Sequence, residues 1–413
     1  MKLLVLHDKP RGEIGGMNTF IAAQNALLVQ AGHEIQEIIC TPEPQTEALH
    51  LKPNGRRVGR RAVQQLSRLL SRADPNALIA HSPYYALGPA TLRWLQGRIP
   101  SIYVLHDVTP LCPRETRLTR AGELCGVPQG FSCVSSGCYR IGDSRRPISD
   151  TYGLLMRGLQ MHAARTVRQW VVPSRYLAEL LEVHGVAGDR IAIVPPFAWP
   201  VPSRDVMPVP GRLLYAGRLV AEKGVRLLFD ALRVLNCAEW SLDVAGAGPE
   251  RGRLEQFAEQ HGWAARIRWL DSLSADALAA QYAQAEVVVM PSLIPESFGL
   301  VGLEAMSHAR PVVGFGSGGM SEWLRDGITG KLARWGDPVS LAAAIDALLL
   351  QPGYARQLGL RARVIATCEF SPAAHLRRMH EVIASTLAEH PSRMPQAAAA
   401  PADTIASRSC APP

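Results

Sequence analysis

The chain has 413 residues, 47% of them hydrophobic, and a formal net charge of +8. This length and hydrophobic content predict two domains, each with its own core. No apolar run reaches the roughly 18 residues of a transmembrane helix, and the basic segments lack the aromatic platforms, recognition helices and zinc fingers of nucleic-acid-binding proteins.

The first predicted element is a β-strand over the apolar run Leu3 to Leu6, which ends at His7 and Asp8. The run is too short for the hydrophobic core of a secretory signal, so we expect the protein to stay in the cytoplasm. Beyond it, apolar runs alternate with helical patterns, which is typical of an α/β domain with a parallel sheet. Further strands are predicted at 35–39, 77–80, 102–105, 170–172 and 191–194, and helices at 18–31, 87–95, 151–166 and from residue 174.

Four residues of this half follow predicted strands, where parallel sheets bind their ligands. Gly15 and Gly16 lie between the first strand and the first helix, where the backbone can approach a phosphate. His106 follows the strand 102–105, and His81 follows the strand 77–80. We expect the imidazole of His106 to face the ligand and treat His81 as the second candidate. The alternative for each is a histidine hydrogen-bonded into loop structure.

The positive charge is concentrated in the N-terminal half. Residues 1–200 hold 23 Lys or Arg against 15 Asp or Glu, and residues 201–413 hold 21 of each kind. Seven of the basic residues lie between Lys52 and Arg72, with no acid between Glu47 and Asp74. Apolar residues at helical spacing in this segment predict an amphipathic helix. Its basic face would bind an anionic membrane surface, and an ordinary solvated helix is the alternative.

Four cysteines fall within 27 positions of a predicted loop: Cys112, Cys125, Cys133 and Cys138. Four thiolates can hold a structural zinc ion, although the paired Cys-x2-Cys spacing of strong zinc motifs is missing. Reduced thiols and disulfides are the alternatives.

Six prolines between residues 195 and 210 interrupt both helix and strand, so the domain boundary is predicted near 196–210. The alternation of strands and helices then restarts, which predicts a second doubly wound unit. Two such sheets facing each other would form one ligand cleft between the domains. The predicted strands are 213–216, 241–245, 267–270 and 287–289, and the helices are 224–235, from 249, 274–282 and 298–309.

Arg218 and Lys223 flank the loop after the first strand of this second unit. A guanidinium and an ammonium there can bind adjacent phosphate oxygens and stabilise the charge of a departing nucleoside diphosphate. The chain contains no Asp-x-Asp pair, the usual metal-binding hook for a diphosphate, so we expect catalysis to need no metal. Gly246-Ala-Gly248, after the strand 241–245, is expected to form a tight turn beside the same ligand.

Two carboxylates, Glu296 and Glu304, lie eight positions apart around the start of a predicted helix. On one continuous helix they would be separated by about 12 Å along its axis, whereas the carboxylate pair of a retaining glycosidase is about 5 to 5.5 Å apart. We therefore expect them to contact different parts of one long ligand. Backbone N–H groups at the helix entrance would bind its diphosphate, namely those of Ser297, Phe298 and Gly299.

The segment from Glu296 to Glu304, with the sequence ESFGLVGLE, resembles the donor-site signature of family 4 of the retaining glycosyltransferases. Further motifs of this family occur in its order along the chain. They are Gly15-Gly16, Val172-Pro173-Ser174, Ala216-Gly217-Arg218 with Glu222-Lys223-Gly224, Val244 to Pro249, and Gly318-Gly319 with Glu322 and Gly327. One departure is Pro195-Pro196-Phe197, where the family has Pro-Asn-Gly.

The resemblance implies the GT-B fold, an α/β architecture with two Rossmann-like doubly wound domains that face a central cleft. Residues 1–196 would bind the acceptor, and residues 197–371 would bind the nucleotide-sugar donor. A crossover helix over 372–389 would return to the first domain. Residues 390–413 are rich in Ala, Pro and Ser and are expected to be a disordered tail.

The resemblance also implies a retaining, metal-independent hexosyltransferase with no cofactor for catalysis. Such an enzyme moves a sugar from a GDP- or UDP-linked donor to a cell-surface glycan or lipid-linked acceptor, as in exopolysaccharide or lipopolysaccharide synthesis. It would work in the cytoplasm, at the inner face of the cell membrane. A sugar-nucleotide epimerase of the same fold and a non-catalytic sugar-nucleotide binding protein are the alternative functions.

The resemblance assigns a role to each site residue. Glu296 would hold sugar hydroxyls, Glu304 the ribose, Arg218 and Lys223 the diphosphate, and His106 would lie near the reacting centre. The catalytic set is thus His106, Glu296, Arg218 and Lys223. The donor-binding set is Gly15, Gly16, Gly217, Gly248, Ser297, Phe298, Gly299, Leu300 and Glu304.

Overall fold

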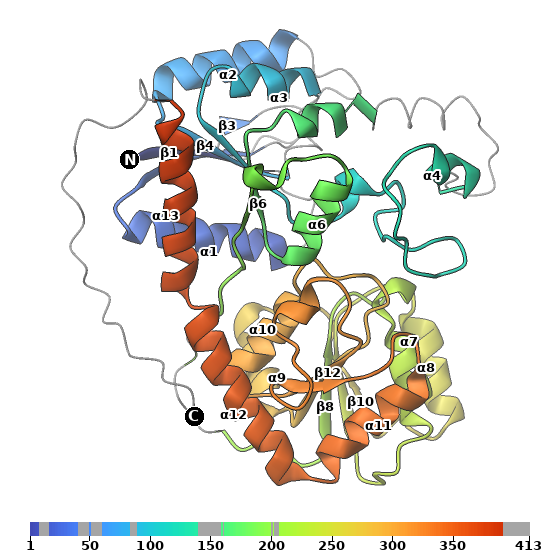
Figure 1. Ribbon diagram of the computed structural model, residues 1–413. Coiled ribbons are helices and arrows are strands. Elements are labelled where there is room, and N and C mark those ends of the chain that lie inside the picture. Colours follow the sequence, from blue (N-terminus) through green and yellow to red (C-terminus); the bar gives the residue numbers. More distant parts are fainter. Residues whose placement is uncertain are drawn as a thin grey trace. The chain divides into compact units, whose positions relative to one another are not determined.

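The computed structural model describes residues 1–7, 16–39, 49–50, 60–82, 89–138, 158–159, 161–199, 201 and 206–390. The chain divides into two α/β units, each built on a parallel sheet (Figure 1). Unit 1 comprises Met1–Pro195 and His375–Pro413, and unit 2 comprises Pro196–Ala374. None of the helices within the described ranges is long and apolar enough to cross a membrane.

Unit 1 has a seven-stranded sheet with the order β3-β2-β1-β4-β5-β6-β7. Its strands are β1 (Lys2–His7), β2 (Glu34–Ile39), β3 (Leu49–His50), β4 (Ala77–His81), β5 (Ser101–Val104), β6 (Gln169–Val172) and β7 (Ile191–Ile193). Its helices are α1 (Gly16–Gln30), α2 (Arg60–Ala73), α3 (Pro89–Gln96), α4 (Phe131–Ser135), α6 (Arg175–Val183) and most of α13 (Pro372–Ala388), with short 3-10 turns at Thr109–Leu111 and Gly188–Arg190.

The predicted first strand is β1, in the middle of this sheet. Leu4 and Leu6 pack into the core on one face of the sheet. Leu3 and Val5 pack into the core on the other face, together with apolar residues of α13. A strand covered on both faces has a continuous apolar sequence, and this explains the unbroken run at the start of the chain.

Unit 2 has a six-stranded sheet with the order β10-β9-β8-β11-β12-β13. Its strands are β8 (Arg212–Ala216), β9 (Ser241–Ala245), β10 (Ile267–Trp269), β11 (Val287–Met290), β12 (Val312–Gly314) and β13 (Gly330–Leu332). Its helices are α7 (Val225–Leu232), α8 (Arg251–Gln260), α9 (Ala275–Gln284), α10 (Leu300–Ser307), α11 (Pro338–Leu349) and α12 (Pro352–Glu369), with 3-10 turns η3 (Ala221–Lys223) and η4 (Gly319–Glu322).

The two sheets confirm the predicted α/β class with two doubly wound units. In each sheet the first strand in sequence lies in the middle, beside the second strand on one side and the fourth or later strand on the other. The strand order therefore reverses between β1 and β4 in unit 1, and between β8 and β11 in unit 2. Parallel sheets of this kind bind their ligands at the carboxyl ends of the strands at such a switch point.

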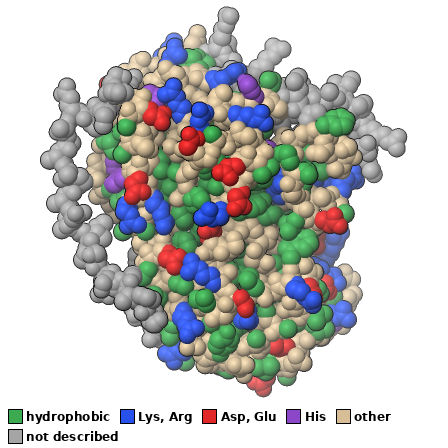
Figure 2. Space-filling model, in the orientation of Figure 1, with side chains coloured by type: hydrophobic (Ala, Val, Ile, Leu, Met, Phe, Trp, Pro, Cys, Tyr) green, Lys and Arg blue, Asp and Glu red, His purple; other side chains and the backbone are tan. Residues whose placement is uncertain are grey.

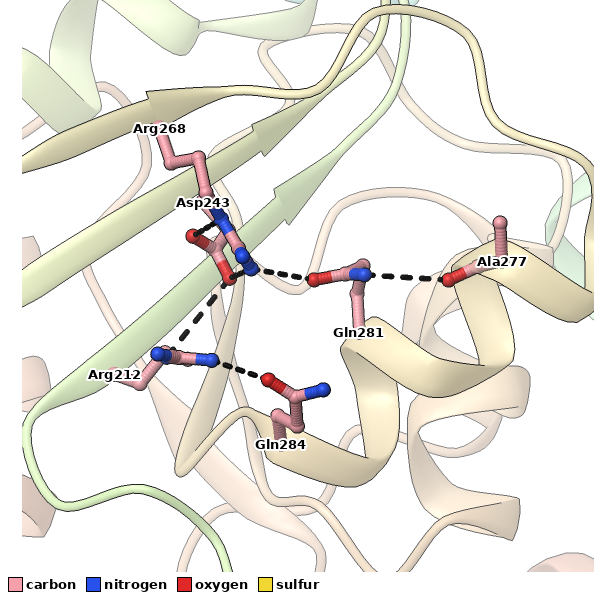
Figure 3. A network of polar contacts seen from close by, with 6 residues as sticks. All are labelled: Arg212, Asp243, Arg268, Ala277, Gln281 and Gln284. Atoms are coloured by element: carbon pink, nitrogen blue, oxygen red, sulfur yellow. Dashed lines mark hydrogen bonds and ion pairs between the residues drawn. The ribbon is translucent and has the colours of Figure 1, made fainter.

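A network of polar side chains joins the sheet of unit 2 to helix α9 (Figure 3). Asp243 in β9 is buried, and its two oxygens accept hydrogen bonds of 2.9 and 2.7 Å from Arg268. The same guanidinium donates to Gln281 in α9 at 2.7 Å, and Arg212 donates to Gln284 one turn further along. A buried carboxylate is tolerated when it is paired in this way, and the pairing fixes α9 against the sheet.

Helix α13 leaves unit 2 and packs on unit 1, since the boundary between the units lies between Ala374 and His375. Its apolar face joins the core that contains Leu3 and Val5 through Leu376, Met379, Val382, Ile383 and Leu387. The predicted tail lies, except for His390, outside the described residues.

Two histidines of α13 form hydrogen bonds to unit 1. The Nδ1–H of His375 donates to the carbonyl oxygen of Pro195 at 2.7 Å, so it joins the two places where the chain passes between the units. One turn further along, Nε2 of His380 lies 2.8 Å from Nε2 of His33. A hydrogen bond between two imidazoles requires that at least one of them is neutral.

We expect this arrangement to lose stability in mild acid. Burial lowers the pKa of His375 and of His33 from 6.5 to about 4, with smaller contributions from Arg378 to the former and from His380 to the latter. The unfolded chain takes up these protons near pH 6.5 and the folded chain only near pH 4. The stabilisation is therefore complete above pH 6.5. Below it, His375 loses about 1.4 kcal/mol per pH unit, and the more exposed His33 loses less.

Thermal unfolding followed by circular dichroism at pH 7.5, 6.5 and 5.5 measures this effect. The midpoint should fall toward pH 5.5, and the fall should be smaller in His375→Gln, whose amide still donates but does not titrate. A wild-type midpoint that stays constant over this range would contradict the expectation.

Candidate functional site

Two loops meet at the switch point of unit 2, one after β8 and one after β11. Arg218 follows β8, and Lys223 ends the turn η3. The Nζ of Lys223 donates to Oε1 of Glu296, in the loop after β11, at 2.6 Å. The side chains of this pair are only 23% and 14% exposed. The structure thus joins two of the residues that the sequence predicted for one ligand.

The charge of Glu296 is set by its neighbours. Burial by itself would raise the pKa of this carboxyl, but Lys223, followed by Ser292 and Arg218, lowers it, and the net effect is a lowered pKa. Glu296 is therefore ionised at neutral pH and can accept hydrogen bonds from hydroxyl groups.

Backbone contacts hold the two loops together. The carbonyl oxygen of Glu222 accepts the N–H groups of Leu293 and Ile294 at 3.0 and 3.2 Å. Gly224 has a φ of +67°, and a Cβ there would lie 1.8 Å from the carbonyl oxygen of Pro291. Only glycine permits so close an approach in this conformation, which explains the family's Glu-Lys-Gly motif at this turn.

The Glu296 backbone is held from a second side. It forms a parallel bridge with Gly318, and its carbonyl oxygen accepts the N–H of Gly319 at 2.6 Å. The Gly318-Gly319 motif therefore supports Glu296 in space, although Gly318 follows Glu296 by more than twenty positions in the sequence.

Helix α10 begins at Leu300, two residues later than expected. The reason is Gly299, whose φ of 87° is left-handed and cannot belong to the helix. The ring of Phe298 is buried and packs edge-on against Phe370 at 5.4 Å, so only its backbone could contact a ligand. Ser297 and Leu300 are partly exposed on either side of this core residue.

Glu304 lies one turn into α10, and the residue is exposed although protein atoms surround its carboxyl. Its Oε2 accepts a hydrogen bond of 2.8 Å from the hydroxyl of Tyr282, in α9. Burial of this carboxyl away from water raises the pKa of Glu304, and the hydrogen bond from Tyr282 lowers it in part. Sequence reasoning missed Tyr282, because an apolar aromatic position in a helix is indistinguishable from a core residue without its partner.

Gly217 and Gly248 lie in the loops that follow β8 and β9. The two loops are joined by backbone bonds, from Gly217 N to Ala245 O at 2.9 Å and from Leu219 N to Ala247 O at 2.8 Å. Both glycines are therefore at the carboxyl edge of the sheet, beside Arg218.

The histidines of unit 1 form a cluster at the other switch point. His7 and His81 are register partners at the ends of β1 and β4. Nδ1 of His81 lies 2.8 Å from Nε2 of His106, which follows β5. Burial lowers the pKa of His106 to about 4, with His7 as a further cause, so the ring is neutral at pH 7. Gly16 is the exposed first residue of α1, and Gly15 lies outside the described residues.

The zinc site suggested for Cys112, Cys125, Cys133 and Cys138 is not supported. All four are free thiols, and no group of three or more His, Cys, Asp or Glu within the described ranges could hold a metal ion. The segment is held by another side chain: buried Arg117 donates to the carbonyl oxygens of Cys125 and Val127 at 2.6 and 2.9 Å.

Family models match both units of the chain. Residues 14–198 match the model described as "Glycosyltransferase Family 4", and residues 210–351 match "Glycosyl transferases group 1". The D-inositol 3-phosphate glycosyltransferase of Paenarthrobacter aurescens (strain TC1) is 28% identical over 375 residues, which are 84% of this chain and 89% of the relative.

Solved structures agree with this assignment at the level of the fold. A sucrose-phosphate synthase from Thermosynechococcus elongatus has a TM-score of 0.69 at 19% identity, over 94% of this chain and 100% of that one. Anabaena HepE in complex with UDP-glucose has a TM-score of 0.66 at 17% identity, over 92% and 99% of the two chains. The chain is therefore a glycosyltransferase of the GT-B fold, with a family 4 domain in its N-terminal half and a group 1 domain in its C-terminal half.

Proposed function

We propose that the protein transfers a sugar, with retention of configuration, from a nucleotide diphosphate donor to a cell-surface glycan or its lipid carrier. The observation that carries the proposal is the pair Lys223–Glu296 at the switch point of unit 2, because it sets a cation and an ionised carboxylate side by side where a nucleotide sugar would bind. A neighbour in fold was solved with UDP-glucose and a relative is named as a glycosyltransferase, which supports a nucleotide-sugar donor. We propose that this donor is a UDP- or GDP-linked sugar.

In this proposal unit 2 binds the donor and unit 1 the acceptor. The bond between the anomeric carbon and the diphosphate breaks, and its electrons go to the diphosphate, whose growing charge Arg218 and Lys223 stabilise. The acceptor oxygen bonds to the same face of the sugar, and its proton goes to the departing diphosphate oxygen, which has taken the electrons of the broken bond. Glu296 accepts hydrogen bonds from sugar hydroxyls, Glu304 holds the ribose, and neutral His106 lies near the reacting carbon.

The experiment that tests this proposal needs no acceptor. The protein is incubated with labelled UDP- and GDP-sugars, after a thermal-shift screen has selected the donor. Slow release of free nucleoside diphosphate supports a transferase. A new sugar nucleotide would instead indicate an epimerase, and tight binding without turnover would indicate a binding protein.

Transfer should continue in the presence of EDTA. Two cations at the carboxyl edge of the sheet can neutralise a diphosphate, and the chain contains no Asp-x-Asp pair to bind a metal there. The measurement compares initial rates before and after treatment with EDTA. A strict requirement for added magnesium or manganese would contradict the proposal.

We also propose that unit 1 binds an anionic membrane surface through the segment Lys52 to Arg72. In α2, Leu66 is buried while Arg68 and Arg72 are exposed, which is an amphipathic helix. Residues 51–59 lie outside the described residues. On the face shown in Figure 2, basic and acidic side chains are interspersed, so the proposal depends on this segment and not on a uniformly basic surface.

Vesicles that contain anionic lipid should bind the protein at low salt and release it at high salt. Each basic residue near such a surface contributes about 1 kcal/mol. Replacing Arg56, Arg57, Arg60 and Arg61 by Gln should therefore abolish binding and leave donor hydrolysis unchanged. A control with the same charge change in unit 2, at the exposed residues Arg233, Arg253, Arg356 and Arg361, should still bind. Equal binding of both variants to anionic vesicles would contradict the proposal.

A further inference from the structure

Tyr282 connects two helices of unit 2 that sequence analysis treats separately. It lies in α9, before β11, and its hydroxyl donates to Oε2 of Glu304, in α10, at 2.8 Å. Its side chain is 2% exposed, so the hydroxyl is buried except for this contact with a carboxylate at the surface.

The position of Tyr282 is fixed by its surroundings. Its ring stacks on His308, with centroids 5.5 Å apart and an interplanar angle of 26°. Its carbonyl oxygen accepts a hydrogen bond of 3.1 Å from buried Arg310. Its neighbours in the chain, Gln281 and Gln284, belong to the network that holds α9 on the sheet (Figure 3).

The contact restricts what the carboxylate can do. A tyrosine hydroxyl that donates to one oxygen sets the plane of the carboxylate and leaves the other oxygen as an acceptor. Burial raises the pKa of Tyr282 well above its usual value, and Glu304 raises it further, so the hydroxyl stays protonated and continues to donate. Glu304 therefore presents one oriented oxygen to a ligand instead of a freely rotating group.

We propose that Tyr282 is a positioning residue for nucleotide recognition: it orients Glu304 so that the remaining oxygen accepts the 2′- and 3′-hydroxyls of the donor's ribose. The inference rests on the proposed ribose-binding role of Glu304. Tyr282 itself touches no part of the substrate. It acts by reducing the conformational freedom that Glu304 would lose on binding, which is how preorganisation raises affinity.

The test compares the binding of UDP with that of 2′-deoxy-UDP, or of GDP with 2′-deoxy-GDP if the donor screen selects guanosine. Isothermal titration calorimetry measures both dissociation constants for four proteins: the wild type, Tyr282→Phe, Glu304→Gln and the control Tyr354→Phe. A hydrogen bond to a charged group is worth about tenfold or more in affinity. The wild type and the control should therefore prefer the ribonucleotide about tenfold or more.

In Tyr282→Phe the preference should fall to about threefold or less, with weaker binding of the ribonucleotide and nearly unchanged binding of the deoxynucleotide. If Tyr282 had a purely structural role, its substitution would weaken the binding of both ligands equally and leave the preference unchanged. This result would overturn the inference. If Glu304→Gln loses the preference and Tyr282→Phe keeps it, the ribose-binding role of Glu304 is supported and the positioning role of Tyr282 is contradicted. If the wild type does not prefer the ribonucleotide, the ribose-binding role of Glu304 is contradicted, and so is the inference about Tyr282.

Discussion

Replacing Lys223 by alanine should lower kcat about 10²- to 10³-fold, with a much smaller change in KM for the donor. The ammonium of Lys223 is placed to oppose the negative charge that grows on the diphosphate as the sugar leaves. A lost group that stabilises developing charge usually reduces turnover by about this factor. Because the charge exists mainly in the transition state, the loss should appear in kcat more than in binding.

Arg218→Ala should behave in the same way, since the charge of Arg218 acts on the Glu296 carboxylate and contributes to its lowered pKa. A suitable control is Lys331→Ala, which removes a lysine that pairs with Asp326 at 2.9 Å outside the proposed donor site. Steady-state rates of donor hydrolysis or transfer measure the effect. Unchanged turnover in both Lys223→Ala and Arg218→Ala would remove the diphosphate assignment.

Replacing Gly224 by alanine should lower the free energy of unfolding by about 3 to 5 kcal/mol, a large value for a single methyl group. The added Cβ would lie 1.8 Å from the carbonyl oxygen of Pro291, and backbone of this kind cannot move aside as a flexible side chain can. The loop that carries Glu296 would have to separate from Lys223. Activity should therefore be lost together with stability.

Gly262→Ala separates two causes of this loss of stability, which are the strain of a left-handed alanine and the contact of its Cβ with Pro291. Gly262 has nearly the same backbone angle, with a φ of +71°, but nothing lies within 4 Å of the position of its Cβ. Its substitution should cost only the strain of a left-handed alanine, about 1 to 2 kcal/mol. Urea denaturation of both variants measures the difference, and equal losses would show that backbone strain alone, without the contact to Pro291, explains the effect.

Local patterns predicted most of the fold. The unbroken apolar run Leu3 to Leu6 indicated a first strand, and β1 is this strand, with a core on each of its faces. The clustered prolines indicated a boundary, and the units divide at Pro195 and Pro196. The start of α10 was wrong by two residues, because a single glycine can either begin a helix or precede it, and the sequence does not show that Gly299 adopts a left-handed φ of 87°.

The cysteine cluster is a case in which spacing alone was insufficient, because the described residues give no support for the suggested zinc site. Four thiols in one loop suggested zinc, but a metal site requires ligands that converge, and convergence is a property of three-dimensional geometry. In the structure two backbone carbonyls of this loop accept hydrogen bonds from Arg117. A lone arginine among polar residues carries no signal of that role in the sequence.

The sequence by itself determined the two doubly wound units, the glycosyltransferase family and the residues to which a donor site can be assigned, because periodicity and motif order are local properties of the chain. Only the tertiary structure decided which residues contact these site residues. Lys223 meets Glu296 across 73 positions, and Tyr282 meets Glu304 across 22. Such contacts depend on which strands become neighbours in the sheet and on how helices pack over them, and burial then sets the charge of each group.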